Sequence, residues 1–269
     1  MSTRYAFSID LDRCIGCQAC VVACHAGNEL GAGEAYIAVR DIVRGQSPDF
    51  WGSFAHQRCF HCAEAPCVGV CPTGTLSKWN GLTVVATEKC SACGYCTDAC
   101  PFHVPHIYNN HVSKCRACLE AVQDGQLPWC AETCPSQAIR FGEREAILAE
   151  AKGRAAALQS RYPKAQVYGE TQLGGLGLLM VLLDEPAAYG LPENPVIPAA
   201  QTVWQTAVQP ASAGLSALAA GVMGLMFLFA RRQHAREKAA LHGAETAPAA
   251  EAAPAGEPEA VQPGEAHHD

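Results

Sequence analysis

Cysteine is the feature that most constrains this chain. Sixteen of its 269 residues are cysteines, far more than packing requires, so they must be disulfides, metal ligands or redox groups. They fall into four groups: Cys14, Cys17, Cys20 and Cys24; Cys59, Cys62, Cys67 and Cys71; Cys90, Cys93, Cys96 and Cys100; and Cys115, Cys118, Cys130 and Cys134. The repeat predicts several sites of one kind, each built from cysteines.

The spacing inside the groups indicates iron–sulfur clusters. The first and third groups read C-x2-C-x2-C-x3-C, and the third is followed by Pro101. This is the bacterial ferredoxin run for a [4Fe–4S] cluster, in which the fourth cysteine ligates the other cluster of a pair. Three thiolates in one tight loop can reach three irons of a cube, while inward backbone N–H groups stabilise the anionic cluster. The proline then leads the chain away with the fourth thiolate.

Two groups depart from that spacing without losing a cysteine. Four residues stand between Cys62 and Cys67 in the second group, and eleven stand between Cys118 and Cys130 in the fourth. The first group ends in Cys-His, whereas the other three end in Cys-Pro. Because a [4Fe–4S] cluster takes four thiolates, the sixteen cysteines predict four clusters in two ferredoxin-like units.

Disulfides and zinc are the rival explanations for so many cysteines. Disulfides also predict an even count, but not the repeated register. Zinc suits a single C-x2-C pair, yet Cys-x3-Cys-Pro, which occurs three times, is not zinc spacing. The net charge of −7 and the lack of a basic stripe argue against nucleic acid as a partner. A metal-stabilised interaction protein stays open as a distant alternative.

The segments between the groups indicate an α+β framework. Half-buried strands are predicted from the apolar and polar pattern over residues 5–14, 35–43 and 81–90. Residues 45–54, GQSPDFWGSF, favour a surface loop. Its aromatic residues Trp51 and Phe54 form either a small satellite core or a partner contact, and we favour the core.

One helix and one further strand are predicted after Pro135. Apolar residues within 142–163 have helical spacing and comprise Ile147, Leu148, Ala151, Ala155 and Leu158, with Pro163 ending the pattern. Residues 180–184, MVLLD, favour a strand. The glycines Gly174, Gly175 and Gly177 resemble part of a nucleotide-binding loop, but the full G-x-G-x-x-G after a strand is missing. Nucleotide binding is therefore not predicted.

A membrane-spanning helix is predicted near the C-terminus. Residues 211–230 contain no charged residue in twenty positions, enough for a helix to cross the ~30 Å hydrocarbon core of a bilayer. The stretch ends abruptly at two arginines, which a helix buried in a soluble core does not explain. Gly221 and Gly224 leave a small-residue face on which another membrane helix can pack. We expect the transmembrane helix at 207–231, with lipid around residues 211–230.

The distribution of basic residues predicts the orientation of this helix. No lysine or arginine occurs at residues 165–230, whereas the C-terminal side carries Arg231, Arg232, Arg236 and Lys238. By the positive-inside rule the C-terminus is cytoplasmic and the cysteine-rich domain periplasmic. Residues 1–13 lack the apolar stretch of a secretory signal. We therefore expect the domain to cross the inner membrane folded, carried by a partner with a twin-arginine signal.

The order of the four groups over Cys14 to Pro135 resembles the four-cluster electron-transfer subunits that accompany molybdenum or tungsten enzymes of the dimethyl-sulfoxide-reductase type. Residues 188–218 look like the stretch that enters the single membrane helix of the iron–sulfur beta subunit of membrane-bound respiratory formate dehydrogenase. That likeness rests on Gly190, Leu191, Pro192, Pro195, Trp204 and Pro210. Together the resemblances cover about residues 5–232.

The resemblance implies a nested pairing of the cysteines, in which each group shares its ligands between two clusters. The implied ligand sets are Cys14, Cys17, Cys20 and Cys134 (set 1); Cys24, Cys115, Cys118 and Cys130 (set 2); Cys59, Cys62, Cys67 and Cys100 (set 3); and Cys71, Cys90, Cys93 and Cys96 (set 4). Each set would hold one [4Fe–4S] cluster.

The resemblance also implies an electron conduit. Formate would be oxidised at a molybdenum or tungsten pterin centre in a separate catalytic subunit, and electrons would pass through four [4Fe–4S] clusters to haem b or quinone in a membrane subunit. A hydrogenase or a sulfur-compound reductase complex is the nearest alternative. No nucleophile–base set is evident, so we expect electron transfer and no bond chemistry in this chain. Five histidines are expected near the clusters or at the surface and not as ligands: His56, His61, His103, His106 and His111.

The expected domain organisation follows from these features. Residues 1–140 form the four-cluster ferredoxin-like domain, with interleaved units of about 1–55 with 101–140, and about 56–100. Residues 141–206 form a connecting segment with one helix, and the transmembrane helix follows. Residues 232–269, rich in Ala, Pro and Glu, are expected to be a disordered cytoplasmic tail. Three of its histidines are expected to be solvated: His242, His267 and His268.

Overall fold

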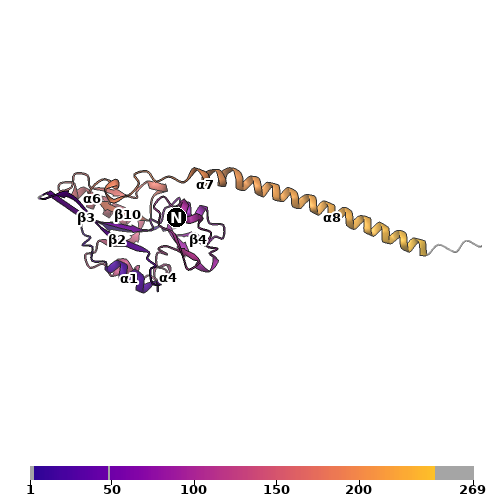
Figure 1. Ribbon diagram of the computed structural model, residues 1–269, viewed down its shortest axis with the longest axis horizontal. Helices are drawn as coiled ribbons and strands as arrows, with labels where there is room; N and C mark the ends of the chain where they lie inside the picture. The colour runs from indigo at the N-terminus through magenta and orange to yellow at the C-terminus, as the bar shows by residue number, and fades with distance from the viewer. Residues whose placement is uncertain (1–2, 48, 246–269) are drawn as a thin grey trace, which may run out of the picture. The chain divides into compact units, whose positions relative to one another are not determined.

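A computed structural model describes residues 3–47 and 49–245 of the chain. The chain divides after Gln209 into two units, and each is described here by itself (Figure 1). The first unit contains all sixteen cysteines, and the described part of the second belongs to one long helix, α8 (Gln209–Glu245). The described residues therefore include every predicted cluster ligand.

A four-stranded mixed sheet lies at the centre of the first unit. Its strands are β1 (Tyr5–Asp10), β8 (Ile139–Glu143), β9 (Gln166–Tyr168) and β10 (Leu178–Leu182). The order is β8-β1-β10-β9, with β1 and β10 parallel and both outer strands antiparallel to their neighbours. All five residues of β10 are buried, as an apolar central strand requires. The strands predicted within 5–14 and 180–184 are confirmed, with β10 beginning slightly earlier.

Helix α6 (Arg144–Leu158) covers one face of this sheet. Ala6 of β1 and Leu179 of β10 pack against Ile147 and Leu148 of the helix. The five apolar residues predicted for the helix are all buried. Because side chains alternate along a strand, Phe7 and its neighbours on the opposite face join the main core, which also contains cysteines. Ala151, Ala155 and Leu158 of α6 belong to this main core as well.

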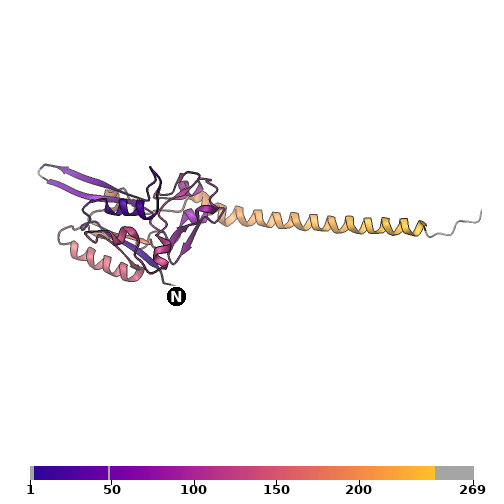
Figure 2. The ribbon, with the colours of Figure 1, turned by 90° about the horizontal axis from the view of Figure 1, so that it is seen from below.

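Three two-stranded hairpins complete the sheet structure of the described residues. They are β2 (Ile37–Gln46) with β3 (Asp49–Arg58), β4 (Leu76–Trp79) with β5 (Leu82–Val85), and β6 (His106–Tyr108) with β7 (His111–Ser113). Strands β2 and β5 confirm the strands predicted within 35–43 and 81–90. Figure 2 shows the β2–β3 hairpin projecting from the rest of the unit.

The loop predicted over residues 45–54 is wrong, because most of it belongs to the β2–β3 hairpin. Ten residues of each strand pair in register, from Ile37 opposite Arg58 to Gln46 opposite Asp49. This pairing satisfies backbone groups that a loop would leave to water. Trp51 packs against the main core and contacts Tyr189 edge to face, with ring centroids 5.9 Å apart. Trp51 therefore packs against a core, as favoured, but against the main core and not a small satellite core.

Short helices connect the strands and carry many of the cysteines. The α-helices are α1 (Ala19–Gly27), α2 (Pro66–Gly69), α3 (Tyr95–Ala99), α4 (Leu119–Gln123), α5 (Trp129–Glu132) and α7 (Ala199–Val203). The 3-10 turns are η1 (Thr87–Lys89), η2 (Gln172–Gly174) and η3 (Pro186–Tyr189), and η4 (Trp204–Val208) is a π-helical turn.

Residues 141–206 do more than connect two parts of the chain. Besides α6 they supply β9 and β10, so half of the central sheet comes from this segment. The parallel pairing of β10 with β1 joins residues that are far apart in sequence. Such a non-local contact leaves no periodic signal near either strand, which is why the sequence suggested only one helix and one isolated strand.

The second unit consists of α8 (Gln209–Glu245) in its described part. The helical stretch Ala199–Ala239 is long and apolar enough to cross a membrane, and an 18-residue window within it has a mean hydropathy of 2.0. The helix continues past Arg231, so the disordered tail expected from residue 232 is wrong as far as Glu245. This stretch is rich in Ala, Arg, Lys and Glu, which favour helices. Residues 246–269, with His267 and His268, and the side chain of His242 lie outside the described residues.

Candidate metal centres

All sixteen cysteines are free thiols in the structure. Two small cavities, each of about 20 Å³, are lined by four of them. One is lined by Cys14, Cys17, Cys20 and Cys134, which are the members of set 1. The other is lined by Cys71, Cys90, Cys93 and Cys96, the members of set 4. In each cavity, the chain brings together cysteines from two of the sequence groups.

The thiols of sets 2 and 3 lie deeper in the core and influence each other's ionisation. Burial raises the pKa of Cys24 well above its usual value, and the thiols of Cys115, Cys130 and Cys118 raise it further. Burial likewise raises the pKa of Cys62, with Cys59, Cys67 and Cys100 adding to the rise. A buried thiol in such company stays neutral unless a positive charge compensates the thiolate. These two neighbourhoods match the membership of sets 2 and 3.

The cysteine loops share one backbone conformation. The second residue after the first cysteine of each group has a positive φ: Gly16 (66°), His61 (48°), Ala92 (54°) and Ala117 (62°). In the last three loops its N–H donates to the sulfur of that first cysteine at 3.4 Å. The Gly16 N–H lowers the pKa of Cys14 against the larger effect of burial. Left-handed turns of this kind point backbone N–H groups at an anion.

Three groups also end in a common turn. The residues three positions after the last cysteine of the Cys-Pro groups, Gly74, His103 and Gln137, all have positive φ. The first group, which lacks the proline, instead keeps its last two cysteines on α1. Cys20 and Cys24 lie one turn apart on this helix, although they belong to sets 1 and 2. Without the proline, the chain thus continues as a helix through the fourth cysteine of this group.

The loop that contains the widened gap between Cys62 and Cys67 contacts the glycine-rich segment 173–177. The Ala63 N–H donates to the Gly175 carbonyl at 3.0 Å, and the Gly177 N–H donates to the Phe60 carbonyl at 3.0 Å. A Cβ atom at Gly177 would lie 2.8 Å from the His61 Cβ, so only glycine allows this approach. The glycines of this segment therefore support a cysteine loop.

The eleven-residue gap between Cys118 and Cys130 folds as α4, a turn at Gly125 with φ of 77°, and α5. Helix α5 contacts α1. At the contact, a Cβ atom on Gly27 would lie 2.5 Å from the Trp129 ring. The Trp129 N–H acts on Cys118 and lowers a pKa that burial raises to about 11. The inserted residues thus bring Cys130 back to the neighbourhood of Cys118.

Of the five histidines, His56 and His61 are buried, whereas the other three are not. The Nε2 atom of His56 lies 3.2 Å from the Cys14 sulfur, and burial lowers the pKa of His56 to about 4, so this ring is neutral. His61 is buried and accepts the Thr83 N–H on Nδ1 at 3.0 Å. His106 and His111 lie on the β6–β7 hairpin, and each lies within reach of a nearby carbonyl. His103 occupies the turn after Cys100.

Buried cations are the site residues that sequence reasoning missed. Arg58 and Lys114 are each 1% exposed. The Nζ atom of Lys114 donates to the Cys115 carbonyl at 2.7 Å, and that of Lys78 donates to the Cys62 carbonyl at 2.6 Å. Lys78 itself is exposed, unlike Arg58 and Lys114. A sequence signal existed, since a basic residue directly precedes the first cysteine of every group.

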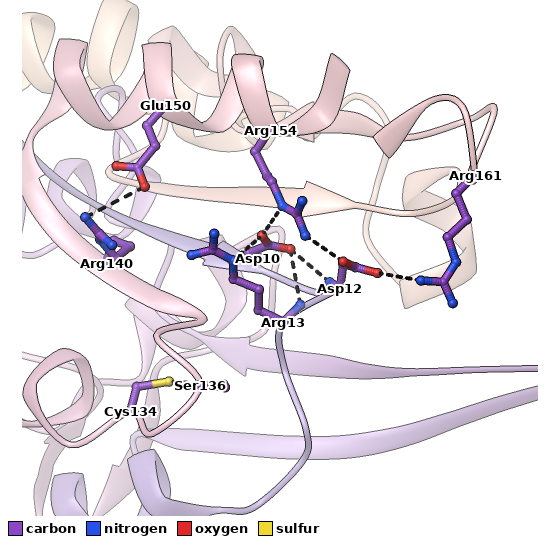
Figure 3. Close-up of polar contacts among 9 residues, drawn as sticks. All are labelled: Asp10, Asp12, Arg13, Cys134, Ser136, Arg140, Glu150, Arg154 and Arg161. Atoms are coloured by element: carbon purple, nitrogen blue, oxygen red, sulfur yellow. Dashed lines mark hydrogen bonds and ion pairs between the residues drawn. The ribbon is translucent and has the colours of Figure 1, made fainter. Parts of the chain in front are cut away.

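An ion-pair network fixes the start of the first cysteine loop (Figure 3). Arg154 of α6 donates to Asp10 at 2.7 Å and to Asp12 at 2.6 Å. Asp10 in turn accepts the Arg13 N–H on its side chain at 3.3 Å and the Cys14 N–H on its carbonyl at 3.1 Å. The network lies in the figure above Cys134, another member of set 1, and it ties α6 to the loop that enters this set.

The arrangement suits clusters better than single ions. No group of three or more His, Cys, Asp or Glu side chains among the described residues is placed to hold one metal ion. Zinc bonds to four sulfurs at ~2.3 Å, which brings those sulfurs within ~3.8 Å of one another. A [4Fe–4S] cluster takes each thiolate on a different iron, so its sulfurs stand farther apart. The thiol sets, the loop N–H groups and the unpaired buried donors of Arg58 fit such an anionic group.

Comparison with known protein families defines the class. Two family models described as 4Fe-4S dicluster domains match residues 13–76 and 50–144. The matched ranges contain all sixteen cysteines. The class is therefore that of iron–sulfur proteins with [4Fe–4S] clusters, as the spacing of the cysteines predicts.

Individual relatives narrow this class. The iron–sulfur subunit of the nitrate-inducible formate dehydrogenase of Escherichia coli (strain K12) is 35% identical over 240 residues, covering 80% of this chain and 82% of the relative. The formate dehydrogenase iron–sulfur subunit of Haemophilus influenzae is 34% identical, covering 76% and 74%. The thiosulfate reductase electron transfer subunit of Salmonella typhi is 38% identical over 53% of this chain. This chain belongs to the family of formate dehydrogenase iron–sulfur subunits, an electron-transfer family related to subunits of other molybdoenzymes.

Proposed function

We propose that this chain holds four [4Fe–4S] clusters, one on each of sets 1 to 4, and relays electrons between two partner subunits. Electrons come from a molybdenum or tungsten pterin subunit that oxidises formate and leave to haem b or quinone in a membrane subunit. The observation that carries the proposal is the grouping of the thiols, since the members of sets 1 and 4 line one cavity each and the members of sets 2 and 3 lie close enough to raise the pKa of Cys24 and Cys62. When bound, the clusters supply one-electron chemistry, and this chain binds, spaces and insulates them.

The exposure of the thiols favours a linear path with sets 1 and 4 at its ends. Cys17 of set 1 and Cys93 of set 4 are exposed, whereas no thiol of sets 2 and 3 is. Cysteines of sets 1 and 2 are close neighbours in the sequence, and so are cysteines of sets 3 and 4. Lys114 connects set 2 with set 3, because it donates to the carbonyl of Cys115 in set 2 and its charge acts on Cys67 in set 3. Electrons would enter at one end set and leave at the other.

Formate is favoured over a sulfur compound as the source of electrons. The formate dehydrogenase relatives align over about four fifths of this chain, whereas the thiosulfate reductase relative aligns over about half. The longer alignment is the observation in favour of formate. A protein in which zinc only holds the fold is a further alternative, and the Cys-x3-Cys-Pro spacing, which occurs three times in the sequence, argues against it.

Formate is expected to reduce the clusters when the chain is purified with its catalytic partner. We expect EPR signals of reduced [4Fe–4S] clusters within one turnover of formate addition, and a pterin-containing subunit in the same preparation. Hydrogen and a reduced sulfur compound serve as control electron donors. Reduction by one of these controls and not by formate would replace the proposed substrate while keeping the conduit.

The cluster domain is expected to face the periplasm, because the basic residues that follow the apolar part of α8 favour a cytoplasmic C-terminus. Protease added to spheroplasts should digest the first unit and leave a C-terminal epitope tag protected. A cytoplasmic protein serves as the lysis control. Protection of the first unit together with digestion of the tag would reverse the orientation.

A further inference from the structure

Arg58 stands out among the basic residues that precede the four groups. Arg13 and Lys89 are exposed, whereas Arg58 and Lys114 are buried. A buried cation requires an anion or several acceptors nearby. Lys114 has two backbone carbonyls, of Cys115 at 2.7 Å and of Thr83 at 3.1 Å. Arg58 has no such set of acceptors.

The neighbours of Arg58 are thiols and an aromatic ring. Its Nη2 atom donates to the Cys130 sulfur at 3.4 Å, and its guanidinium carbon lies 4.8 Å from the centre of the Phe7 ring. Its Nε and Nη1 atoms are buried and have no hydrogen-bond partner. No Asp or Glu among the described residues forms an ion pair with it. The anions available to Arg58 are therefore those of the cysteine sets.

The contacts of Arg58 point to set 2. Its hydrogen bond goes to the sulfur of Cys130, a member of that set. Cys24 and Cys115 of the same set are buried, as Cys130 is. The positive charge of Arg58 is therefore held against set 2 in the protein interior.

Resting on the proposed ligation of a cluster by set 2, we propose that Arg58 is a positioning residue that supplies a fixed positive charge and makes that cluster easier to reduce. Reduction adds one electron from the neighbouring cluster and leaves Arg58 protonated, so no proton is exchanged. Net charge and hydrogen bonds to the sulfurs set the potential of such clusters. A buried charge acts strongly because little water screens it. A conduit needs its interior member to accept electrons readily.

The test is an EPR-monitored redox titration of the whole complex with Arg58→Met, which removes the charge and keeps an unbranched apolar side chain. The set 2 signal is first assigned by its loss in Cys118→Ser. We expect the equilibrium constant for its one-electron reduction to fall at least tenfold, which is a shift of about 59 mV to lower potential. The matched control is Lys78→Met, since Lys78 contacts the Cys62 carbonyl. It should leave the set 2 potential unchanged.

The variants distinguish the proposal from its alternatives. An unchanged set 2 potential in Arg58→Met, with wild-type iron content, would overturn it. An equal shift at set 2 in Lys78→Met would overturn it too, because the effect would not be local. If Arg58→Met loses the cluster, Arg58→Lys decides, since a wild-type potential supports the role of the charge and a tenfold fall contradicts it. Absence of the set 2 signal from the wild-type complex would instead refute the proposed ligation.

Discussion

Cys134→Ser is expected to remove the cluster of set 1 and to leave the cluster of set 2 in place. Cys134 lies more than a hundred residues from the other members of set 1, yet it lines the same cavity. Loss of one of four thiolates leaves one iron without its sulfur ligand, so iron content should fall by up to about four per chain. Iron analysis and EPR of the reduced complex measure the loss.

Cys130→Ser is the matched control, because Cys130 lies one helical turn before Cys134 and its thiol acts on Cys24 of set 2. It should remove the set 2 signal and retain the set 1 signal. A nested pairing is contradicted if Cys134→Ser abolishes the set 2 signal alone. The pair of variants also controls for general damage to the loop that both cysteines share.

Gly177→Ala is expected to destabilise the cluster of set 3 and the sheet next to it. The new Cβ would lie 2.8 Å from the His61 Cβ and 3.0 Å from the His61 carbonyl oxygen. Relieving this overlap must move the backbone of either β10 or the Cys59–Cys62 loop, at a cost of about 1–3 kcal/mol. On heating, the cluster absorbance of set 3 should be lost at a lower temperature than in the wild type.

Gly153→Ala provides the control for this substitution. Gly153 lies inside α6, where a Cβ atom would have no neighbour within 4 Å. Alanine in a helix interior is favoured over glycine by about 0.5–1 kcal/mol, so this variant should be as stable as the wild type or more so. Equal melting of both variants would show that Gly177 does not need to be glycine, and the close approach to His61 would be refuted.

Much of the fold could be predicted from local sequence patterns. The helix over Ile147 to Leu158 and strands β1, β2 and β5 follow from periodicity within a few residues. The β2–β3 hairpin was missed because a short window of Gly and Pro suggested a loop, whereas cross-strand pairing over ten residues outweighs it. The pairing of β10 with β1 was missed for a related reason. It joins distant segments, and neither segment alone records its partner.

The candidate site likewise has features that local sequence patterns predict and features that depend on contacts between distant segments. The spacing of the cysteines predicts [4Fe–4S] clusters because the ligand loops are local, and the family matches agree. The purpose of Gly177 could not be predicted, because it depends on contact with a loop more than a hundred residues earlier. Arg58 carried a visible signal next to Cys59, but the same signal occurs at the exposed Arg13. Burial distinguishes the two, and burial is a property of the assembled core.

Iron and acid-labile sulfide analysis of the purified complex, combined with EPR of the reduced protein, tests the central claim most directly. Four thiol sets with one [4Fe–4S] cluster each predict about sixteen irons and sixteen sulfides per chain, with interacting reduced-cluster signals. The sixteen cysteines leave no ligand spare. Stoichiometric zinc, or about eight irons and two clusters, would contradict the four-cluster conduit.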